Sequence, residues 1–406
     1  MRIWLSCALL SLVSCTPSSA STPDAGDDAS VVDDAGRDAA PRPDVGPDAY
    51  VRDASWTDAG MPRTDYGSAG PHPVGNVHVT MLDRTGARML PVEIWYPADE
   101  SARAAATTGQ SMSAFESGAR AATLTSLVAT APASCVRAQT RSAAAPAAAA
   151  ASTPWPAIVF SHCHGCMRFD VAEIAERLAS HGIVVAAPDH LEDTYWDATL
   201  APLDATYLAV RSSDVSSVLD RLLDATATEL PVDLRGHVDA TRVGVMGHSY
   251  GAITTGAAVM SDSRFVAAMA IAAPLSAFGA DVSTIHVPYL FLLAQEDNSI
   301  GLAGNAVLRN DYTHVGGPAW LVEVADAGHF SFSDIAGLHD GWNAGCGMGM
   351  RQAPPRAAFT YADNAEAREL GADVAAAFWG SQLLGDPAAV NQLSGLEGRA
   401  LVSMHD

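Results

Sequence analysis

The pattern of apolar and polar residues between positions 155 and 324 alternates between two periodicities. Short continuous apolar runs bounded by Pro or Gly, such as 157–161 and 183–187, predict strands that are buried on both faces. Between these two runs, apolar residues recur at helical spacing from Val171 to Leu178, and Gly182 follows where a helix typically ends. The further strand candidates are 242–246, 267–272, 288–293 and 319–324.

Two more segments complete the predicted domain. Residues 77–81 and 90–96 predict an antiparallel strand pair joined by a turn at 83–86. A second helix carries apolar residues at helical spacing between Val215 and Leu222, and Asp214 is placed to cap or to begin it. The alternation of strands and helices predicts an α/β fold, with a mostly parallel central sheet and helices on both faces. The chemistry of such sheets lies at the carboxyl ends of the strands.

An Ala- and Ser-rich insertion at about 98–153 separates the strand pair from the first buried strand. Its part around 112–129 has helical potential, whereas the run AAAPAAAAASTP predicts a loop. Because the insertion directly precedes the strand at 157–161, we expect it to cover the site as a lid.

The first residues of the chain predict a lipoprotein signal peptide at 1–14. Arg2 precedes an apolar run that is too short to span a bilayer, and the sequence Leu-Val-Ser-Cys at 12–15 resembles a bacterial lipobox. We therefore expect Cys15 to carry lipid and to anchor the chain in the bacterial cell envelope, on the periplasmic face or at the cell surface. The alternative is an ordinary secretory signal, which would release the protein.

Residues 15–66 predict a disordered acidic linker rich in Asp, Ala and Pro. Positions 16–66 hold 11 Asp, no Glu and 4 Arg, and they show no apolar period that could form a buried face. The Asp clusters lack the Gly and the distal Glu of a calcium-binding EF-hand loop. The folded domain is therefore expected at 67–406.

The charge of the chain excludes several classes of function. The sequence has 46 acidic residues against 23 basic ones, and every basic residue is Arg, so the net charge is −23. This balance argues against nucleic acid and anionic membranes as partners, because phosphate binding needs clustered cations. The absence of Lys excludes a Schiff-base lysine and the lysine of a nucleotide-binding P-loop.

A candidate nucleophile follows the strand at 242–246. The sequence Gly-His-Ser-Tyr-Gly at 247–251 is a G-x-S-x-G motif between a predicted strand and a helical stretch. In this context the small residues permit a sharp turn that exposes the Ser side chain at a helix N-terminus. We predict that Ser249 is a nucleophile, against the alternative of a tight structural turn, and that His248 packs beside it.

A Ser hydroxyl needs a base to remove its proton, and the base needs a carboxylate to orient it. His329 lies in the loop after the last predicted strand, and Asp297 directly follows the strand before that. The chain order Ser249, Asp297, His329 is the one typical of this kind of site. Glu296 is the alternative acid.

The oxyanion of an acyl-transfer reaction requires two backbone N–H donors. Tyr250, which immediately follows the nucleophile, is one candidate. The other is expected in the loop at 161–166, after the first buried strand.

Several stretches of the sequence resemble one family. PAIVFSHCHGC, RFDVAEIAERLASHGIVVAAPDH, GHSYGA and AGHFSFSDI, with the Arg-Ser-Ser-Asp at 211–214, are similar to α/β-hydrolases of the platelet-activating-factor acetylhydrolase and dienelactone-hydrolase-like group. Bacterial polyester hydrolases and chlorophyllases are more distant relatives. The resemblance covers roughly 76–385 outside the insertion and implies the α/β-hydrolase fold and a Ser-His-Asp triad. Alignment of the family's His-Gly-x-Gly loop makes the backbone N–H of His164 the second oxyanion donor.

The sequence departs from this family in three places. Cys163 stands where relatives have the first Gly of the oxyanion loop. The stretch MAIAAPLSAFG contains no acid, although some acetylhydrolases carry their triad acid at the corresponding place, and this favours Asp297. Ser249 excludes the Cys-nucleophile chemistry of the dienelactone hydrolases proper.

Four Cys remain in the predicted domain, namely Cys135, Cys163, Cys166 and Cys346. Beyond the inner membrane an even set predicts disulfides, and all three pairings stay open. The alternative is zinc bound by the His and Cys residues at 162–166. Four ligands within five residues cannot readily surround one ion tetrahedrally, so we predict no metal. Asp189 and His190 are expected to form structural hydrogen bonds.

The sequence therefore predicts a serine carboxylic-ester hydrolase that works through an acyl-enzyme, without a cofactor, on short-chain or lipid-derived esters. The alternatives are a polyester hydrolase or lipase-like enzyme and a non-catalytic, surface-tethered binding module. The expected partner is a small-molecule or lipid ester, neutral or cationic rather than polyanionic, and membrane contact is expected only through the lipid anchor.

Overall fold

The computed structural model of the chain describes residues 64–144, 154–396 and 398–406. The expected signal peptide, Cys15 and nearly all of the expected linker lie outside the described residues, as does the 145–153 part of the insertion. Tyr66, which the sequence pattern assigned to the linker, is instead buried at 3% exposure, and its ring packs on Gly380. The folded part therefore begins before residue 67.

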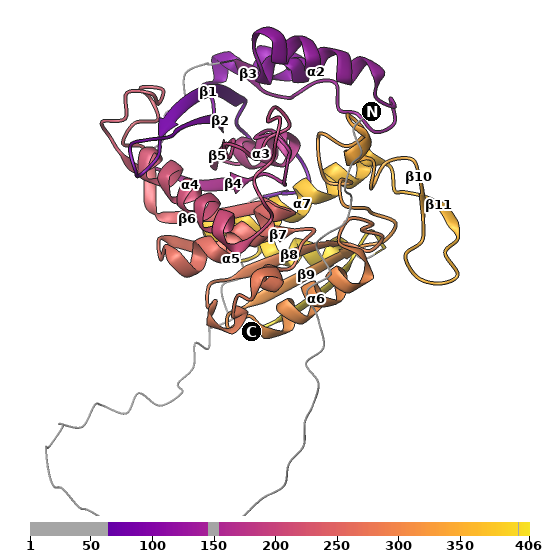
Figure 1. Cartoon of the computed structure of the whole chain (residues 1–406). Coiled ribbons are helices and arrows are strands. Elements are labelled where there is room, and N and C mark those ends of the chain that lie inside the picture. The colour runs from indigo at the N-terminus through magenta and orange to yellow at the C-terminus, as the bar shows by residue number, and fades with distance from the viewer. Residues whose placement is uncertain (1–63, 145–153, 397) are drawn as a thin grey trace, which may run out of the picture. The chain divides into compact units, whose positions relative to one another are not determined.

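Ten strands of the described chain form one sheet in the order β12-β9-β8-β7-β6-β4-β5-β2-β1-β3. In Figure 1 the sheet runs from indigo β1 near the top to orange β9 near the bottom. The strands are β1 (Val74–Leu82), β2 (Met89–Pro97), β3 (Ala143–Ala144), β4 (Trp155–Ser161), β5 (Val184–Pro188), β6 (Val238–His248), β7 (Phe265–Ile271), β8 (Tyr289–Ala294), β9 (Ala319–Val324) and β12 (Leu401–His405).

The middle of the sheet is parallel, and antiparallel pairs join it to β2 on one side and to β12 on the other. Strands β5, β4, β6, β7, β8 and β9 run parallel, whereas β1 and β2 form a hairpin and β12 pairs antiparallel with β9. The hairpin turns at 83–86, where the Gly86 N–H donates to the Asp83 carbonyl. The predicted α/β architecture is thus confirmed, with β3 and β12 as additional strands.

Helices cover both faces of the sheet. Apolar residues of α3 and α7 pack on one face, and those of α4, α5 and α6 pack on the other. The helices are α1 (Arg103–Thr108), α2 (Gly118–Thr130), α3 (Ala172–Ser180), α4 (Ala205–Leu223), α5 (Tyr250–Ser261), α6 (Gly301–His314) and α7 (Asn364–Leu383). The 3-10 turns are η1 (Glu100–Ala102), η2 (Met112–Phe115), η3 (Leu275–Phe278), η4 (Val282–Thr284), η5 (Asp340–Trp342) and η6 (Ala389–Leu396). A separate hairpin consists of β10 (Met348–Met350) and β11 (Ala358–Thr360).

The prediction that Asp214 caps or begins the second helix is wrong. The N-cap of α4 lies ten residues earlier, at Asp204, whose side chain accepts a hydrogen bond from the Tyr207 N–H. Asp214 lies in the middle of the helix, is 1% exposed, and contacts Arg88 at 2.5 Å and His190 at 2.9 Å. Buried polar residues, among them Arg211 and Ser212, interrupt the apolar period between Leu208 and Val215, so the period revealed only the second half of the helix.

The insertion is tied into the domain rather than loosely attached. Arg168 pairs with Glu116 at 2.7 Å, and Arg137 pairs with Asp334 at 3.0 Å. Strand β3 extends the sheet beside β1. Among the described helices, none is both long and apolar enough to cross a membrane.

Candidate active site

A strained turn presents Ser249 between β6 and α5. Ser249 has φ 56° and ψ −118°, a backbone conformation that is rare for a residue with a side chain. The two flanking glycines make the turn sterically feasible. A Cβ on Gly247 would lie 2.2 Å from the Gly251 carbonyl oxygen, and one on Gly251 would lie 1.8 Å from the Ser161 carbonyl oxygen. Ser249 is half-buried at the start of α5, whereas His248 and Tyr250 on either side are buried.

Asp297 and His329 come together at the ends of neighbouring strands. Asp297 follows β8 and His329 follows β9, and the His329 Nδ1 lies 2.7 Å from the Asp297 Oδ2. The other carboxylate oxygen of Asp297 accepts hydrogen bonds from the N–H groups of Ser299 and Ile300, at 2.9 and 3.0 Å. This arrangement fixes the His329 ring, because a carboxylate oxygen accepts the Nδ1 proton and leaves Nε2 as an acceptor.

The alternative acid, Glu296, has other partners. Its carboxylate pairs with Arg351 at 3.0 Å and accepts a hydrogen bond from the Gln352 N–H at 2.8 Å. Asp297 is therefore the acid that contacts His329 in this structure.

His248 connects the Ser249 turn to the His329 loop. Its Nε2 lies 2.9 Å from the His329 carbonyl oxygen, and the two rings have centroids 5.0 Å apart. Within the described part of the chain, the Ser249 hydroxyl makes no hydrogen bond to His329. Such hydrogen bonds are often long without substrate and tighten when the complex forms.

The loop after β4 lies directly against the start of α5, as the close approach of Gly251 to Ser161 requires. In this loop the Cys163 N–H points to the Asp170 carboxylate, and the Gly165 N–H donates to Asp193. For the His164 N–H, no acceptor is found among the described residues. Tyr250 is the first residue of α5, so its N–H belongs to the amides that a helix leaves unpaired.

A buried ion pair between Arg211 and Asp193 contacts the side chains of Tyr250 and His164, the two residues whose N–H groups are the candidate oxyanion donors. The Arg211 guanidinium carbon lies 4.7 Å from the ring centroid of Tyr250 and the Nη2 donates to the Ser161 hydroxyl at 3.0 Å. Asp193 in turn lies 2.5 Å from the His164 Nδ1. The resemblance pointed to Arg211, but no local pattern marked Asp193 as its partner.

Two disulfides use all four Cys of the domain. Cys163 is bonded to Cys166 within the loop after β4, and Cys135 in the insertion is bonded to Cys346. The prediction of disulfides is confirmed, and the pairing left open by the sequence is resolved. With both sulfurs in a disulfide, the loop cannot offer zinc the thiolate ligands that it prefers.

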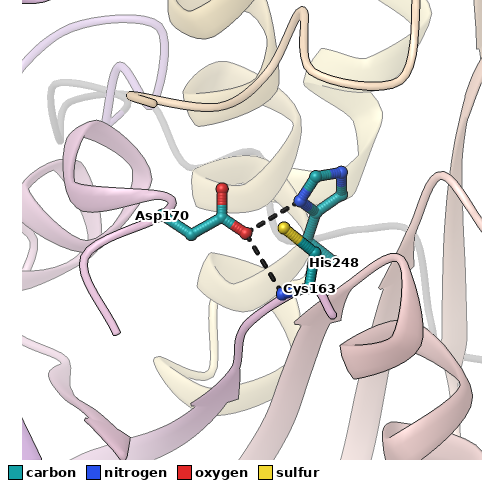
Figure 2. A group of neighbouring side chains, drawn as sticks. All are labelled: Cys163, Asp170 and His248. Atoms are coloured by element: carbon teal, nitrogen blue, oxygen red, sulfur yellow. Dashed lines mark hydrogen bonds and ion pairs between the residues drawn. The ribbon is translucent and has the colours of Figure 1, made fainter. Parts of the chain in front are cut away.

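One cluster of potential metal ligands lies beneath the turn. Donor atoms of Cys163, Asp170 and His248 lie within 4.8 Å of one another. Figure 2 shows that the Asp170 carboxylate points to the His248 ring and to the Cys163 backbone nitrogen. The Cys163 sulfur belongs to a disulfide and the other two side chains satisfy each other, so this donor set fits a hydrogen-bonded core better than a metal centre.

Two further His residues, His162 in the loop after β4 and His190 after β5, are fully buried. Burial lowers the pKa of His162 and of His190 well below the usual value. His190 contacts Asp214, and burial raises the pKa of that carboxyl to about 6. Asp189 pairs with Arg168 at 2.9 Å. These groups form structural hydrogen bonds, as expected for 189–190.

Two family profiles match the chain. One is described as PET hydrolase-like and matches residues 145–336. The other is described as platelet-activating factor acetylhydrolase, isoform II, and matches residues 61–201. The first range contains Ser249, Asp297 and His329, and both ranges contain the loop at 161–166.

The chain is also similar in sequence to platelet-activating factor acetylhydrolases. Platelet-activating factor acetylhydrolase from Cavia porcellus is 30% identical over 173 residues, which are 34% of this chain and 39% of that protein. The protein of the same name from Bos taurus is 27% identical over 175 residues, again 34% of this chain and 39% of the relative. The matches thus span well under half the length of these relatives.

One solved structure is similar to this chain over most of its length. It is described as a ferulic acid esterase from Streptomyces cinnamoneus and matches with a TM-score of 0.56 and 22% identity, over 85% of this chain and 98% of that chain. At this identity the likeness speaks for the fold. Together with the sheet order and the two family profiles, it supports an α/β-hydrolase fold and a likeness to the platelet-activating-factor acetylhydrolase group.

Proposed function

We propose that this protein is a serine carboxylic-ester hydrolase that works through an acyl-enzyme. The observation that carries the proposal is the strained Ser249 turn beside a buried Asp297–His329 hydrogen bond of 2.7 Å. The PET hydrolase-like and acetylhydrolase profiles support the same reaction class.

In the proposed reaction the Ser249 Oγ attacks the ester carbonyl carbon while the His329 Nε2 takes its proton. Asp297 holds the ring in the tautomer that makes Nε2 the acceptor and stabilises the imidazolium that forms. The oxyanion accepts hydrogen bonds from the N–H groups of Tyr250 and His164. When the tetrahedral intermediate collapses, His329 returns the proton to the leaving alkoxide. Water then attacks the acyl-enzyme with His329 as base, releasing the acid and restoring Ser249.

The strongest support for an oxyanion site comes from the hydrogen bonds of the backbone N–H groups at 163–165. The N–H groups of Cys163 and Gly165 have acceptors inside the protein, whereas that of His164 has none in the described region. An amide without an acceptor in the protein is free to donate to a substrate oxygen. Replacement of the family's Gly by Cys163 is compatible with this geometry, because the side chain forms its disulfide within the loop.

The substrate class is proposed as short-chain or lipid-derived esters, and the PET hydrolase-like profile favours a polyester hydrolase as the second candidate. The net charge of −23 favours neutral or cationic substrates. The deciding experiment is a kcat/KM series on p-nitrophenyl esters from acetate to palmitate, with an insoluble aromatic polyester film beside it. A maximum at acetate or butyrate supports the first candidate, whereas hydrolysis of the film supports the second.

Ser249→Ala is the control for the reaction itself. We expect wild type to hydrolyse p-nitrophenyl butyrate and to be labelled by a fluorophosphonate at Ser249, and the variant to do neither. If wild type and variant are equally inactive and the probe leaves Ser249 unmodified, the protein is a binding module with a hydrolase fold.

We also propose that lipid on Cys15 anchors the protein in the cell envelope. The proposal rests on the lipobox-like sequence at 12–15 alone. Expression in a bacterium with radiolabelled palmitate should label the wild-type protein and leave Cys15→Ser unlabelled. Release of wild type into the aqueous phase of a detergent partition would contradict the anchor.

A further inference from the structure

His248 is buried directly behind the turn that carries Ser249, and both of its ring nitrogens face acceptors. Its side chain is 1% exposed, its Nδ1 lies 2.8 Å from the Asp170 Oδ2, and its Nε2 lies 2.9 Å from the His329 carbonyl oxygen. In Figure 2 the His248 ring and the Asp170 carboxylate point toward one another. A carbonyl oxygen can only accept, so Nε2 must carry a proton.

The Asp170 carboxylate acts as an acceptor on both oxygens, so Nδ1 of His248 must carry a proton as well. Oδ2 faces the Cys163 N–H at 3.4 Å as well as His248, and Oδ1 accepts a hydrogen bond from the Ser333 hydroxyl. Burial works against both charges, yet the ion pair outweighs it: Asp170 raises the pKa of His248, and His248 lowers that of Asp170. The pair is an imidazolium and a carboxylate.

This pair contacts three loops that leave the ends of different strands. His248 is the last residue of β6 and precedes the nucleophile turn, and its other nitrogen holds the backbone of the loop after β9. Asp170 holds the loop after β4 through the Cys163 N–H. Its own carbonyl oxygen accepts the Asp334 N–H at 2.7 Å, a second tie to the segment that follows His329.

We propose that His248 and Asp170 are positioning residues of the ester-hydrolase site, which set the His329 loop and the oxyanion loop relative to Ser249. The inference rests on the proposed function. Neither side chain touches substrate; each acts through the loop it holds.

The physical argument for such a role is the low stabilising value of a buried ion pair. Moving two charges out of water is costly, and well-packed apolar residues often stabilise a core as well or better. A charged pair contributes positional specificity that apolar packing lacks. Its hydrogen bonds are directional and therefore fix the positions of the groups that they join. Reacting groups that are misplaced by about 1 Å can lose about 100-fold in rate.

Two substitutions separate the two hydrogen bonds of His248. In His248→Gln the amide N–H₂ falls near the position of Nε2 and can still donate to the His329 carbonyl. In His248→Asn the amide falls near Nδ1 and can still donate to Asp170, but the bond to His329 is lost. Asp373→Asn is the matched control, because Asp373 forms a buried ion pair with Arg177 between α3 and α7.

The measurements are kcat and KM on p-nitrophenyl butyrate, with the full chain and with unfolding followed in urea. We expect His248→Asn to lower kcat by about 100-fold with KM little changed, and His248→Gln to regain about tenfold of that loss. Asp373→Asn should lose stability while it keeps kcat. A kcat of His248→Asn close to that of wild type, or an equal loss in Asp373→Asn, would overturn the positioning role.

Nitrogen NMR of histidine-labelled wild type provides a readout that needs neither activity nor a variant that folds. At neutral pH we expect protons on both ring nitrogens of His248, and one protonated nitrogen would overturn the ion pair. If wild type neither hydrolyses esters nor reacts with a fluorophosphonate, the proposed function fails and the positioning role fails with it. In that case the NMR result still decides the charge state of His248.

Discussion

Cys135 and Cys346 form a disulfide across 211 positions of sequence, with their Cα atoms 5.6 Å apart. It joins the insertion to the segment that follows His329 in the chain. The second disulfide, Cys163–Cys166, spans three positions in the loop after β4. One bond therefore closes a large loop of the fold, and the other constrains a short piece of the candidate site.

The two disulfides are expected to differ in what they stabilise. Chain entropy gives about 5 kcal/mol for closing a loop of some 200 residues and about 2 kcal/mol for one of four residues. Cys135→Ser/Cys346→Ser should therefore lower the free energy of unfolding more than Cys163→Ser/Cys166→Ser, as measured in urea. The short-loop variant should instead lower kcat, because its loop carries the His164 N–H.

Dithiothreitol tests the same assignment on wild type. Reduction should lower both the free energy of unfolding and kcat, as the two double variants do together. The variant in which all four Cys are replaced by Ser should not respond to dithiothreitol. Equal stability losses in the two double variants would contradict the loop-length argument.

The identity of the triad acid is tested by a matched pair of adjacent substitutions. Asp297→Asn removes the carboxylate that accepts from His329, and comparable changes leave the base in the wrong tautomer with about 10⁴-fold lower kcat. Glu296→Gln should leave kcat almost unchanged, since Glu296 pairs with Arg351. A larger loss in Glu296→Gln than in Asp297→Asn would make Glu296 the acid.

Local patterns predicted the parts of the fold that are buried on both faces. The continuous apolar runs at 157–161 and 183–187 correspond to strands β4 and β5, because parallel strands covered by helices leave no polar face. Strand β12 was not predicted, since it lies at the sheet edge with Leu401 and Met404 exposed and carries no such signature. The start of α4 was missed for a different reason, because the buried polar residues Arg211 and Ser212 interrupt the apolar period after Leu208.

The candidate site was predictable only where a motif marks it. The G-x-S-x-G turn and the positions of Asp297 and His329 after strands follow from sequence spacing. Asp170 and Asp193 could not be predicted in this way, because each depends on a partner that is distant in the sequence. Asp170 pairs with His248, and Asp193 pairs with Arg211. Charge pairing over 18 to 78 residues leaves no periodic signal in one sequence.

The Arg211–Asp193 pair is expected to matter for both folding and rate. Arg211→Met leaves the buried Asp193 carboxylate without its guanidinium, and breaking a buried pair in this way costs about 3–5 kcal/mol. Because Arg211 also packs on Tyr250 while Asp193 contacts His164, kcat should fall as well. Urea unfolding and ester kinetics measure the two effects.

Arg177→Met is the matched control for this prediction, since Arg177 is also buried and paired, with Asp373. It should lose stability, though less than Arg211→Met because Arg399 still pairs with Asp373 at 3.0 Å, and it should keep kcat. If both variants lose kcat in proportion to stability, the Arg211 pair has no specific effect on the site.

The insertion is expected to influence substrate preference through α2. Arg120 of α2 lies 5.3 Å from the ring centroid of Trp196, and the Trp196 indole N–H donates to Glu116 at 3.1 Å. Deleting 105–150 would remove Arg137 and Cys135 and leave Asp334 and Glu176 without their buried partner, so we expect that deletion to unfold the domain.

Arg120→Ala is the milder test of the lid hypothesis. It removes a contact worth about 0.5–1 kcal/mol and should leave the fold intact. A changed ratio of kcat/KM between phenyl and ethyl butyrate supports a lid at the site, and an unchanged ratio in a folded variant contradicts it.

The His248–Asp170 pair should give the protein a defined dependence of stability on pH. The folded pKa of His248 is above its usual 6.5, so its contribution is full below pH 6.5 and is lost as pH rises through the folded pKa. The folded pKa of Asp170 is below its usual 3.8, so its contribution is present above pH 3.8 and is lost as pH falls through the folded pKa. The pair should therefore stabilise the fold most between about pH 4 and 6.5.

This window is measured as the difference in unfolding free energy between wild type and His248→Gln/Asp170→Asn, which keeps amides at both positions but cannot titrate. We expect the difference to be largest between about pH 4 and 6.5 and to shrink in alkaline solution. His190→Gln is the control of opposite sign: burial lowers the pKa of His190, so wild type should lose stability relative to this variant as pH falls below 6.5. A difference for the double variant that shrinks as pH falls below 6.5, as expected for His190, would mean that His248 is neutral in the folded protein, and the imidazolium–carboxylate pair would then be wrong.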